Sequence, residues 1–152
     1  MNDVRFPTAL QAMLSLALAH ASGVARLSSA KLAAGTGTHP TLMRRLLRDL
    51  VDAGLLVASK GRDGGVALAR PAVKITLADI HAAATGDKGL WRPREDIPHR
   101  CVVSTHMTEY FEKVDAEATA AARAALRRRS LADALADIRK MDRAPGIRVI
   151  DR

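Results

Sequence analysis

The chain has 152 residues, a hydrophobic content of 48% and a formal net charge of +8. This length allows one hydrophobic core of ordinary size, and the apolar content excludes a disordered polybasic tail. The excess of Lys and Arg favours a polyanionic partner, nucleic acid ahead of a membrane surface, and the single Cys excludes an intramolecular disulfide.

The sequence contains no run that is long and apolar enough to span a bilayer, and its start lacks the pattern of a signal peptide. The nearest stretch, residues 9–21, is interrupted by Gln11 and Ser15. We therefore expect a cytoplasmic protein with no membrane partner.

Two helices are expected first along the chain. One covers residues 8–21, which are rich in Ala and Leu and follow Pro7. The next is short: Ser28 or Ser29 caps its start, and glycines at positions 35 and 37 end it.

A third helix begins with Thr38 or His39 as its cap and Pro40 in its first turn, and it ends at Gly54. Its apolar residues recur at the helical interval and predict a buried stripe. The members of this stripe are Met43, Leu46, Leu47 and Leu50.

The stretch LLVASKGRDGGVALAR consists of two β-prone runs joined by a glycine-containing turn, which predicts a hairpin with Lys60 and Arg62 at its tip. A further helix follows, capped at Thr76 and ended by Gly86. Helices followed by a hairpin in this order predict a winged helix-turn-helix domain. The expected fold is mainly α with a small β-hairpin wing and a long C-terminal dimerisation helix.

The long helix runs from Ser104 or Thr105 to about Arg128. Its apolar residues are spaced four, three, four, three and four apart, as in a coiled-coil seam, which favours a homodimer. The alternative is that the seam packs within the chain against a helix that begins near Ser130. The seam consists of Met107, Phe111, Val114, Ala118, Ala121 and Ala125.

These elements divide the chain into four parts. A winged helix-turn-helix DNA-binding domain covers residues 1–86. Residues 87–103 form a loop that is a candidate sensing region and contains two prolines. Dimerisation helices cover 104–142, and 143–152 form a tail.

Basic side chains on the third helix and at the hairpin tip suit the binding of double-stranded DNA, because phosphates need cations and base edges need side chains that reach a groove. The alternative for the helix alone is a solvated face of an amphipathic helix. The candidate DNA-binding residues are Thr38, His39, Thr41, Arg44, Arg45, Arg48, Lys60 and Arg62.

Cys101 stands between His99 and His106 and has three interpretations. It is an ordinary, partly buried Cys, a redox-sensing thiolate stabilised by its cationic neighbours and the helix start, or a zinc ligand, for which the spacing is wrong. The only Trp, Trp91, either caps the core or lines a ligand pocket, and we expect a core cap. The sequence carries no phosphate-binding glycine motif and no hydrolase signature, so we expect no enzyme.

The run from GTGTHPTLMRR through GLLVASKGRDGGVALAR to ITLADI resembles the Rrf-two (BadM) family of bacterial transcription regulators, relatives of IscR and NsrR. The resemblance extends from about Leu10 to Ile138. It implies a homodimeric winged-helix repressor.

Members that bind an iron-sulfur cluster carry three Cys before the long helix, so the single Cys101 implies no cofactor. The stretch HRCVVSTHM looks like the CPVG stretch of the cluster-free, YwnA-like branch, with Val102, Val103 and Ser104 in place of Pro-Val-Gly.

We therefore expect a sequence-specific DNA-binding transcriptional regulator, a homodimeric repressor that responds to oxidants or thiol reagents through Cys101. The alternative is a protein-interaction module with a helix-turn-helix fold and no specific operator. The sequence does not specify the operator, the regulated genes or the effector.

Overall fold

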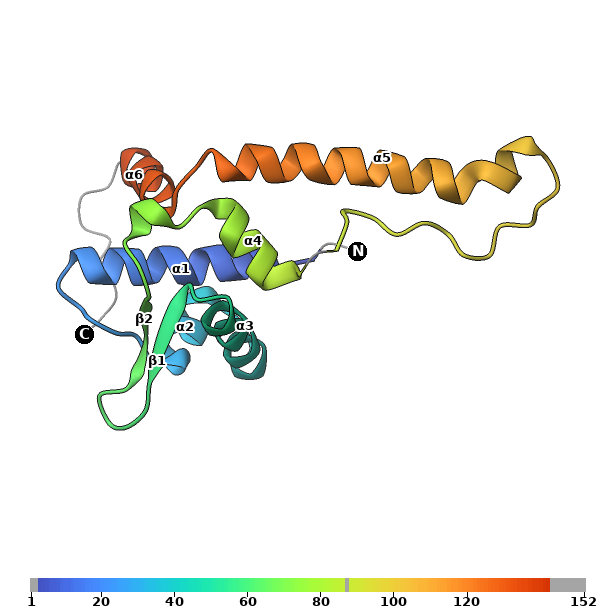
Figure 1. Cartoon of the computed structure of the whole chain (residues 1–152). Helices are drawn as coiled ribbons and strands as arrows, with labels where there is room; N and C mark the ends of the chain where they lie inside the picture. Colours follow the sequence, from blue (N-terminus) through green and yellow to red (C-terminus); the bar gives the residue numbers. More distant parts are fainter. Residues whose placement is uncertain (1–2, 87, 143–152) are drawn as a thin grey trace.

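The structure is a computed structural model that describes residues 3–86 and 88–142. Figure 1 shows a head built from helices and one hairpin, from which a single long helix extends as an arm. The predicted fold class, mainly helical with a two-stranded wing and a long C-terminal helix, is confirmed. The predicted tail at 143–152 lies outside the described residues. The head begins with α1 (Arg5–Ala21), α2 (Ser29–Thr36), α3 (Pro40–Asp52), β1 (Leu56–Ser59) and β2 (Gly65–Leu68).

Local capping residues fix most of the helix ends in the head. The Ser28 side chain accepts a hydrogen bond from the Lys31 backbone N–H (3.2 Å) at the start of α2, as predicted. Gly37, with φ +64°, ends that helix in the left-handed region. At the start of α3, the Nδ1 atom of His39 accepts from the Thr41 backbone N–H (3.2 Å).

Helix α1 starts at Arg5, three residues before the predicted start at residue 8. Asp3 accepts a hydrogen bond from the Arg5 backbone N–H (2.9 Å), which supports the first turn. Pro7 lies within that turn, where a missing N–H costs nothing because the first four N–H groups of a helix have no intrahelical partner. The prediction was wrong because it treated Pro7 as preceding the helix.

The wing is an antiparallel hairpin in which Leu56 pairs with Leu68 and Ser59 pairs with Gly65. Val66 of β2 also exchanges backbone hydrogen bonds with Leu27, just before α2 (2.9 and 3.1 Å). The hairpin is therefore fixed to the helical part of the head through β2, one residue from the turn-side end of that strand, and its tip extends beyond the helices (Figure 1).

The head has one hydrophobic core. The predicted stripe of α3 is buried, and it packs with residues from α1, the strands and α4 (Leu77–Thr85). Fully buried side chains include Met13, Met43, Leu46, Leu50, Leu55 and Ile80.

Helix α6 (Leu131–Met141) belongs to this same core. Its residues Leu131 and Leu135 are buried against α1 and the short 3₁₀ helix η1 (Ala72–Lys74). The Leu131 backbone N–H donates to the Ile75 carbonyl oxygen (2.7 Å), which ties the start of α6 to the segment before α4. The domain boundaries stay a prediction, but α6 shares its core with the helices before residue 86.

Helix α5 (Val102–Arg127) starts two to three residues before the predicted Ser104 or Thr105. It leaves the head as an arm, and the segment after α4 runs beside it (Figure 1). Thr119 is its only buried residue among those described. Most of the predicted seam faces solvent, with Met107 37% and Val114 38% exposed, whereas Phe111 and Ala118 are half-buried. The alternative of a seam packed on α6 is wrong, because α6 packs on α1 and η1 instead.

Across the described residues, the helices are all too short or too polar to cross a membrane.

Candidate nucleic-acid interface

A groove of about 660 Å³ lies between α3 and the wing. Its walls come from the exposed side of α3, the hairpin tip and the start of α2. Four basic side chains line it, two from each of its main walls: Arg44, Arg48, Lys60 and Arg62. Cations from two separate elements of the chain therefore face the same space.

Helix α3 turns Arg44 and Arg48 outward because its other side is buried. The two arginines are one helical turn apart and exposed. Leu47, which is buried between them, forms part of the floor of the groove. Arg44 Nη2 lies 3.4 Å from Thr41 Oγ1, which directs that guanidinium toward the start of the helix.

The wing carries Lys60 and Arg62 on a turn that only glycine allows. A Cβ on Gly64 would lie 2.5 Å from the Ser59 carbonyl oxygen, which is a backbone atom. Gly65 has φ +142° and approaches the Leu27 backbone as closely. The glycine pair therefore lets the hairpin close tightly while both basic side chains remain exposed at its tip.

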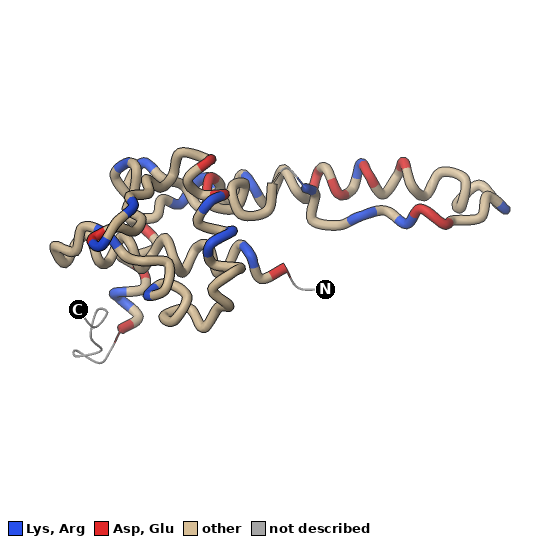
Figure 2. Tube along the Cα trace, turned by 90° about the horizontal axis from the view of Figure 1, so that it is seen from below, with Lys and Arg blue, Asp and Glu red and all other residues tan. Residues whose placement is uncertain are grey.

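The electrostatic character of this region is strongly basic. Among the described residues, none of the four groove cations forms an ion pair, so their charges are available to a ligand. Figure 2 shows basic positions on several segments of the head and both signs of charge along the arm. Residues 38–74 contain seven basic side chains (Arg44, Arg45, Arg48, Lys60, Arg62, Arg70, Lys74) and three acidic ones (Asp49, Asp52, Asp63).

The other four predicted residues lie on the first half of α3 and just before it, outside the groove lining. Thr41 and Arg45 are exposed on the helix, and Thr38 is half-buried. His39 is exposed, but its Nδ1 atom already serves the helix cap, which leaves Nε2 for an external partner. The structure thus brings Arg44 and Arg48 of α3 together with Lys60 and Arg62 of the wing, and the other four predicted residues lie on or just before the first half of α3.

The groove residues that were not predicted as contacts include two polar ones at the start of α2, Ser28 and Ser29. The sequence identified them only as helix caps. The same capping pattern is the signal that points to them, because N–H groups at a helix start also bind phosphate.

Cys101 is the N-cap residue of α5, and its thiol is exposed. Hydrogen bonds from the Ser104 backbone, the Ser104 hydroxyl and the Val103 backbone lower the pKa of this thiol. The Ser104 hydroxyl oxygen in turn accepts from the Cys101 backbone N–H (3.0 Å). Cys101 is therefore placed as an accessible thiol whose ionised form the helix start favours.

Trp91 does not cap the core of the head, contrary to our expectation. Its side chain is 54% exposed, and its ring centroid lies 6.4 Å from that of Phe111 on the arm. Among the described residues, no three His, Cys, Asp or Glu side chains are grouped so that they could hold a metal ion.

The sequence is similar to those of known transcriptional regulators. Residues 3–137 match the family model of Rrf2, which is described as an iron-dependent transcriptional regulator. YwgB of Bacillus subtilis (strain 168), whose name describes an HTH-type transcriptional regulator, is 33% identical over 95 residues. Those residues are 59% of this chain and 61% of YwgB, so the chain spans less than two thirds of that relative.

Solved structures share the fold over nearly the whole chain. The structure of T. potens IscR is similar with a TM-score of 0.65 at 24% identity, covering 96% of this chain and 93% of that one. CymR (YrzC), the global cysteine regulator of B. subtilis, is similar with a TM-score of 0.64 at 21% identity, covering 90% and 97%. At these identities the likeness establishes a common fold.

Proposed function

The chain belongs to the Rrf2 family of transcriptional regulators, and we propose that it is a homodimeric repressor that recognises a specific DNA sequence. This is a family of regulators and not of enzymes. The observation that carries the proposal is the groove between α3 and the wing, where two separate elements present unpaired basic side chains to one space.

In this proposal α3 enters the major groove with its exposed face toward the bases. Arg45 and Arg48 are the side chains for base edges, since an Arg donates two hydrogen bonds to a guanine. Lys60 and Arg62 of the wing contact the phosphates or the adjacent minor groove. Thr38 and His39, at the start of α3, are placed for a phosphate at the helix N-terminus.

The second subunit binds along α5. Four of the six seam residues (Met107, Val114, Ala121 and Ala125) are exposed in the single chain, and Phe111 and Ala118 are half-buried. The spacing of the seam is that of helices that pack in pairs. Small Ala side chains in the last part of the seam allow close approach of a second helix. A two-fold dimer would present two α3 helices to two half-sites of an operator.

The proposed repressor works without an iron-sulfur cluster, as in the cluster-free, YwnA-like branch. The chemistry of its donors supports this: such clusters are held mainly by Cys thiolates, and the chain has a single Cys. The residues present do not fit the iron site that the family description implies.

The signal in this proposal is chemical modification of Cys101 by an oxidant or a thiol reagent. Its thiol is exposed, and the lowered pKa increases the thiolate fraction near neutral pH. Because Cys101 is the cap of α5, a change at its sulfur perturbs the first turn of the dimerisation helix. We expect Cys101→Ser to abolish any response to oxidant while leaving DNA binding intact.

Fluorescence anisotropy tests the proposal, with a duplex taken from upstream of the protein's own gene and a scrambled duplex of equal length. We expect a preference of at least about a hundredfold for the upstream duplex, which is modest for a specific regulator. Equal, weak binding to both duplexes, whatever other upstream sequences are tried, would favour a protein-interaction module with a basic face.

A further inference from the structure

A second hollow, of about 1010 Å³, lies between the start of α1, the end of α4 and the segment that follows α4. This volume is at the upper end of the range for small-molecule sites, which is about 300–1,000 Å³. It shares no lining residue with the groove between α3 and the wing. We call this hollow the α1–α4 cleft.

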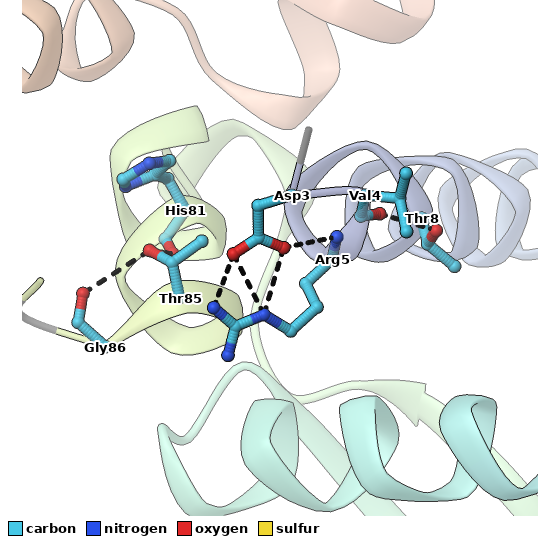
Figure 3. A network of polar contacts seen from close by, with 7 residues as sticks. All are labelled: Asp3, Val4, Arg5, Thr8, His81, Thr85 and Gly86. Carbon is cyan, nitrogen blue, oxygen red and sulfur yellow. Dashed lines mark hydrogen bonds and ion pairs between the residues drawn. The ribbon is translucent and has the colours of Figure 1, made fainter. Parts of the chain in front are cut away.

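The positive charges of the cleft outnumber the negative ones. Arg5, Lys88 and Arg92 line it with a single acidic residue, Asp3. Figure 3 shows that Asp3 is already engaged by Arg5, beside the end of α4. Its carboxylate accepts from the Arg5 backbone N–H (2.9 Å) and from Arg5 Nε (3.0 Å), and these bonds together with nearby Lys88 lower the pKa of Asp3 to about 2.

Lys88 and Arg92 are the cations that remain for a ligand. Both are exposed, and neither forms an ion pair with another described residue. They are four residues apart on one segment, and a small molecule with two anionic groups can pair with both. Carboxylates and phosphates bind such cations through charge-assisted hydrogen bonds.

Between these cations the cleft wall is apolar. Leu90 and Trp91 line it and are 44% and 54% exposed, and Val4 lines the facing wall from the start of α1. Exposed apolar side chains flanked by cations favour an anion that has an apolar body over a bare inorganic ion.

This wall is attached to the arm. The Leu90 backbone N–H donates to Thr119 Oγ1 (3.1 Å), and the Trp91 backbone N–H donates to Asp115 Oδ1 (2.9 Å). Gly89 approaches α5 so closely that a Cβ there would overlap the Asp115 carboxylate. A ligand held between α1 and this segment therefore contacts the head directly. It is coupled to the long helix indirectly, because two hydrogen bonds join the segment to α5.

We propose that the α1–α4 cleft binds a small organic dianion with an apolar body, held by Lys88 and Arg92 against Trp91. Occupancy of the cleft fixes the angle between the head and α5. An effect of this angle on DNA affinity would rest on the proposed repressor function, whereas binding of the dianion does not.

Trp91 is the only Trp in the chain, so its fluorescence reports on the cleft directly. The probe is trans-1,4-cyclohexanedicarboxylate, which has two carboxylates and an apolar ring and does not absorb where Trp is excited. Cyclohexanol supplies the ring without charge, and inorganic phosphate supplies charge without the ring. We expect a saturable change in Trp91 emission, with a dissociation constant of roughly a millimolar or below, for the dicarboxylate alone.

Lys88→Ala combined with Arg92→Ala removes both cations and is expected to weaken binding by about tenfold or more. Arg94→Ala is the matched control. Arg94 lies on the same segment, is outside the cleft lining and pairs with Asp96 (3.3 Å), so its removal is expected to leave binding unchanged. Circular dichroism spectra that match the parent's show that the variants are folded.

The results overturn the proposal if the parent shows no saturable signal up to about 10 mM. They also overturn it if the double variant binds as the parent does, or if phosphate binds as tightly as the dicarboxylate. Because no DNA is present, each of these outcomes leaves the repressor proposal standing. Conversely, loss of specific DNA binding in a separate assay does not affect the cleft.

Discussion

Gly65, at the start of β2, determines how the wing sits on the head. Its φ is +142°, and a Cβ there would lie 2.5 Å from the carbonyl oxygen of Leu27 and 2.8 Å from the carbonyl carbon. Both are backbone atoms, so no side-chain rotation relieves the overlap. We expect Gly65→Ala to push the hairpin away and break the two hydrogen bonds that Val66 and Leu27 exchange.

The magnitude follows from these contacts. A non-glycine residue at positive φ costs about 1–3 kcal/mol, and each of the two lost hydrogen bonds costs about 1 kcal/mol net. Gly65→Ala should therefore destabilise the fold by about 4 kcal/mol. Gly61 is the matched control, because its φ is also positive, at +104°, but a Cβ there meets nothing within 4 Å. Gly61→Ala should cost only the backbone strain, about 2 kcal/mol.

Thermal unfolding followed by circular dichroism measures both variants. A difference of about 2 kcal/mol corresponds to roughly 4–8 °C in Tm for a chain of this size, with Gly65→Ala the less stable. Its DNA affinity should also fall below that of Gly61→Ala, because the wing moves away from α3. Equal Tm values for the two variants would refute the reasoning that the wing is fixed through Leu27.

The remaining predictions concern the recognition helix, the arm and the thiol. Arg48→Ala should weaken binding to the operator by about 1–3 kcal/mol, the value of one bidentate base contact, and reduce the preference over a scrambled duplex in anisotropy titrations. Val114→Asp places a charge in the exposed seam and should convert the dimer to a monomer in light scattering. Ser104→Ala removes one hydrogen bond that lowers the pKa of Cys101, so the pKa rises and the pH profile of iodoacetamide alkylation shifts to higher pH.

The changes at Arg48 and Val114 each have a control on another helix or another face of the same helix. Arg139→Ala removes an exposed Arg from α6, outside the groove, and should leave operator affinity unchanged. Glu112→Gln alters an exposed position of α5 outside the seam and should leave the dimer intact. A dimer that survives Val114→Asp would show that the seam is not the interface, and an unshifted alkylation profile would show that Ser104 does not tune the thiol.

Most features that depend on neighbouring residues were predicted correctly from the sequence, apart from the starts of α1 and α5. Ser28 and Thr76 cap their helices as expected, because a capping side chain bonds to an N–H only two or three residues away. The same holds for the hairpin, where the glycines of the turn fall between two β-prone runs. The buried stripe of α3 followed from periodicity alone.

Features that depend on distant residues were not predicted. Trp91 lies against Phe111 of the arm and not on the core, because backbone hydrogen bonds to Asp115 and Thr119 determine where its segment runs. One local feature was also missed, the early start of α5, because Cys101 is not a usual cap and two β-branched residues follow it.

The residues of the candidate site could be predicted from local sequence patterns, but their arrangement in space could not. The basic residues of α3 and of the wing are evident in the sequence, since each belongs to a short local pattern. That Arg44 and Arg48 share a groove with Lys60 and Arg62 depends on how the hairpin docks on Leu27. Ser28 and Ser29 line the groove because of the same docking of the hairpin, which no local sequence pattern specifies.

The salt dependence of operator affinity tests most directly the claim that the groove between α3 and the wing holds DNA. If each of its four cations neutralises one phosphate, log Kobs should fall against log salt with a slope of about −3.6 per chain, or roughly −7 for a dimer. Replacing Lys60 and Arg62 together by Ala should reduce the steepness by about 1.8 per chain. A slope near zero, or a slope that is unchanged in this double variant, would contradict the account.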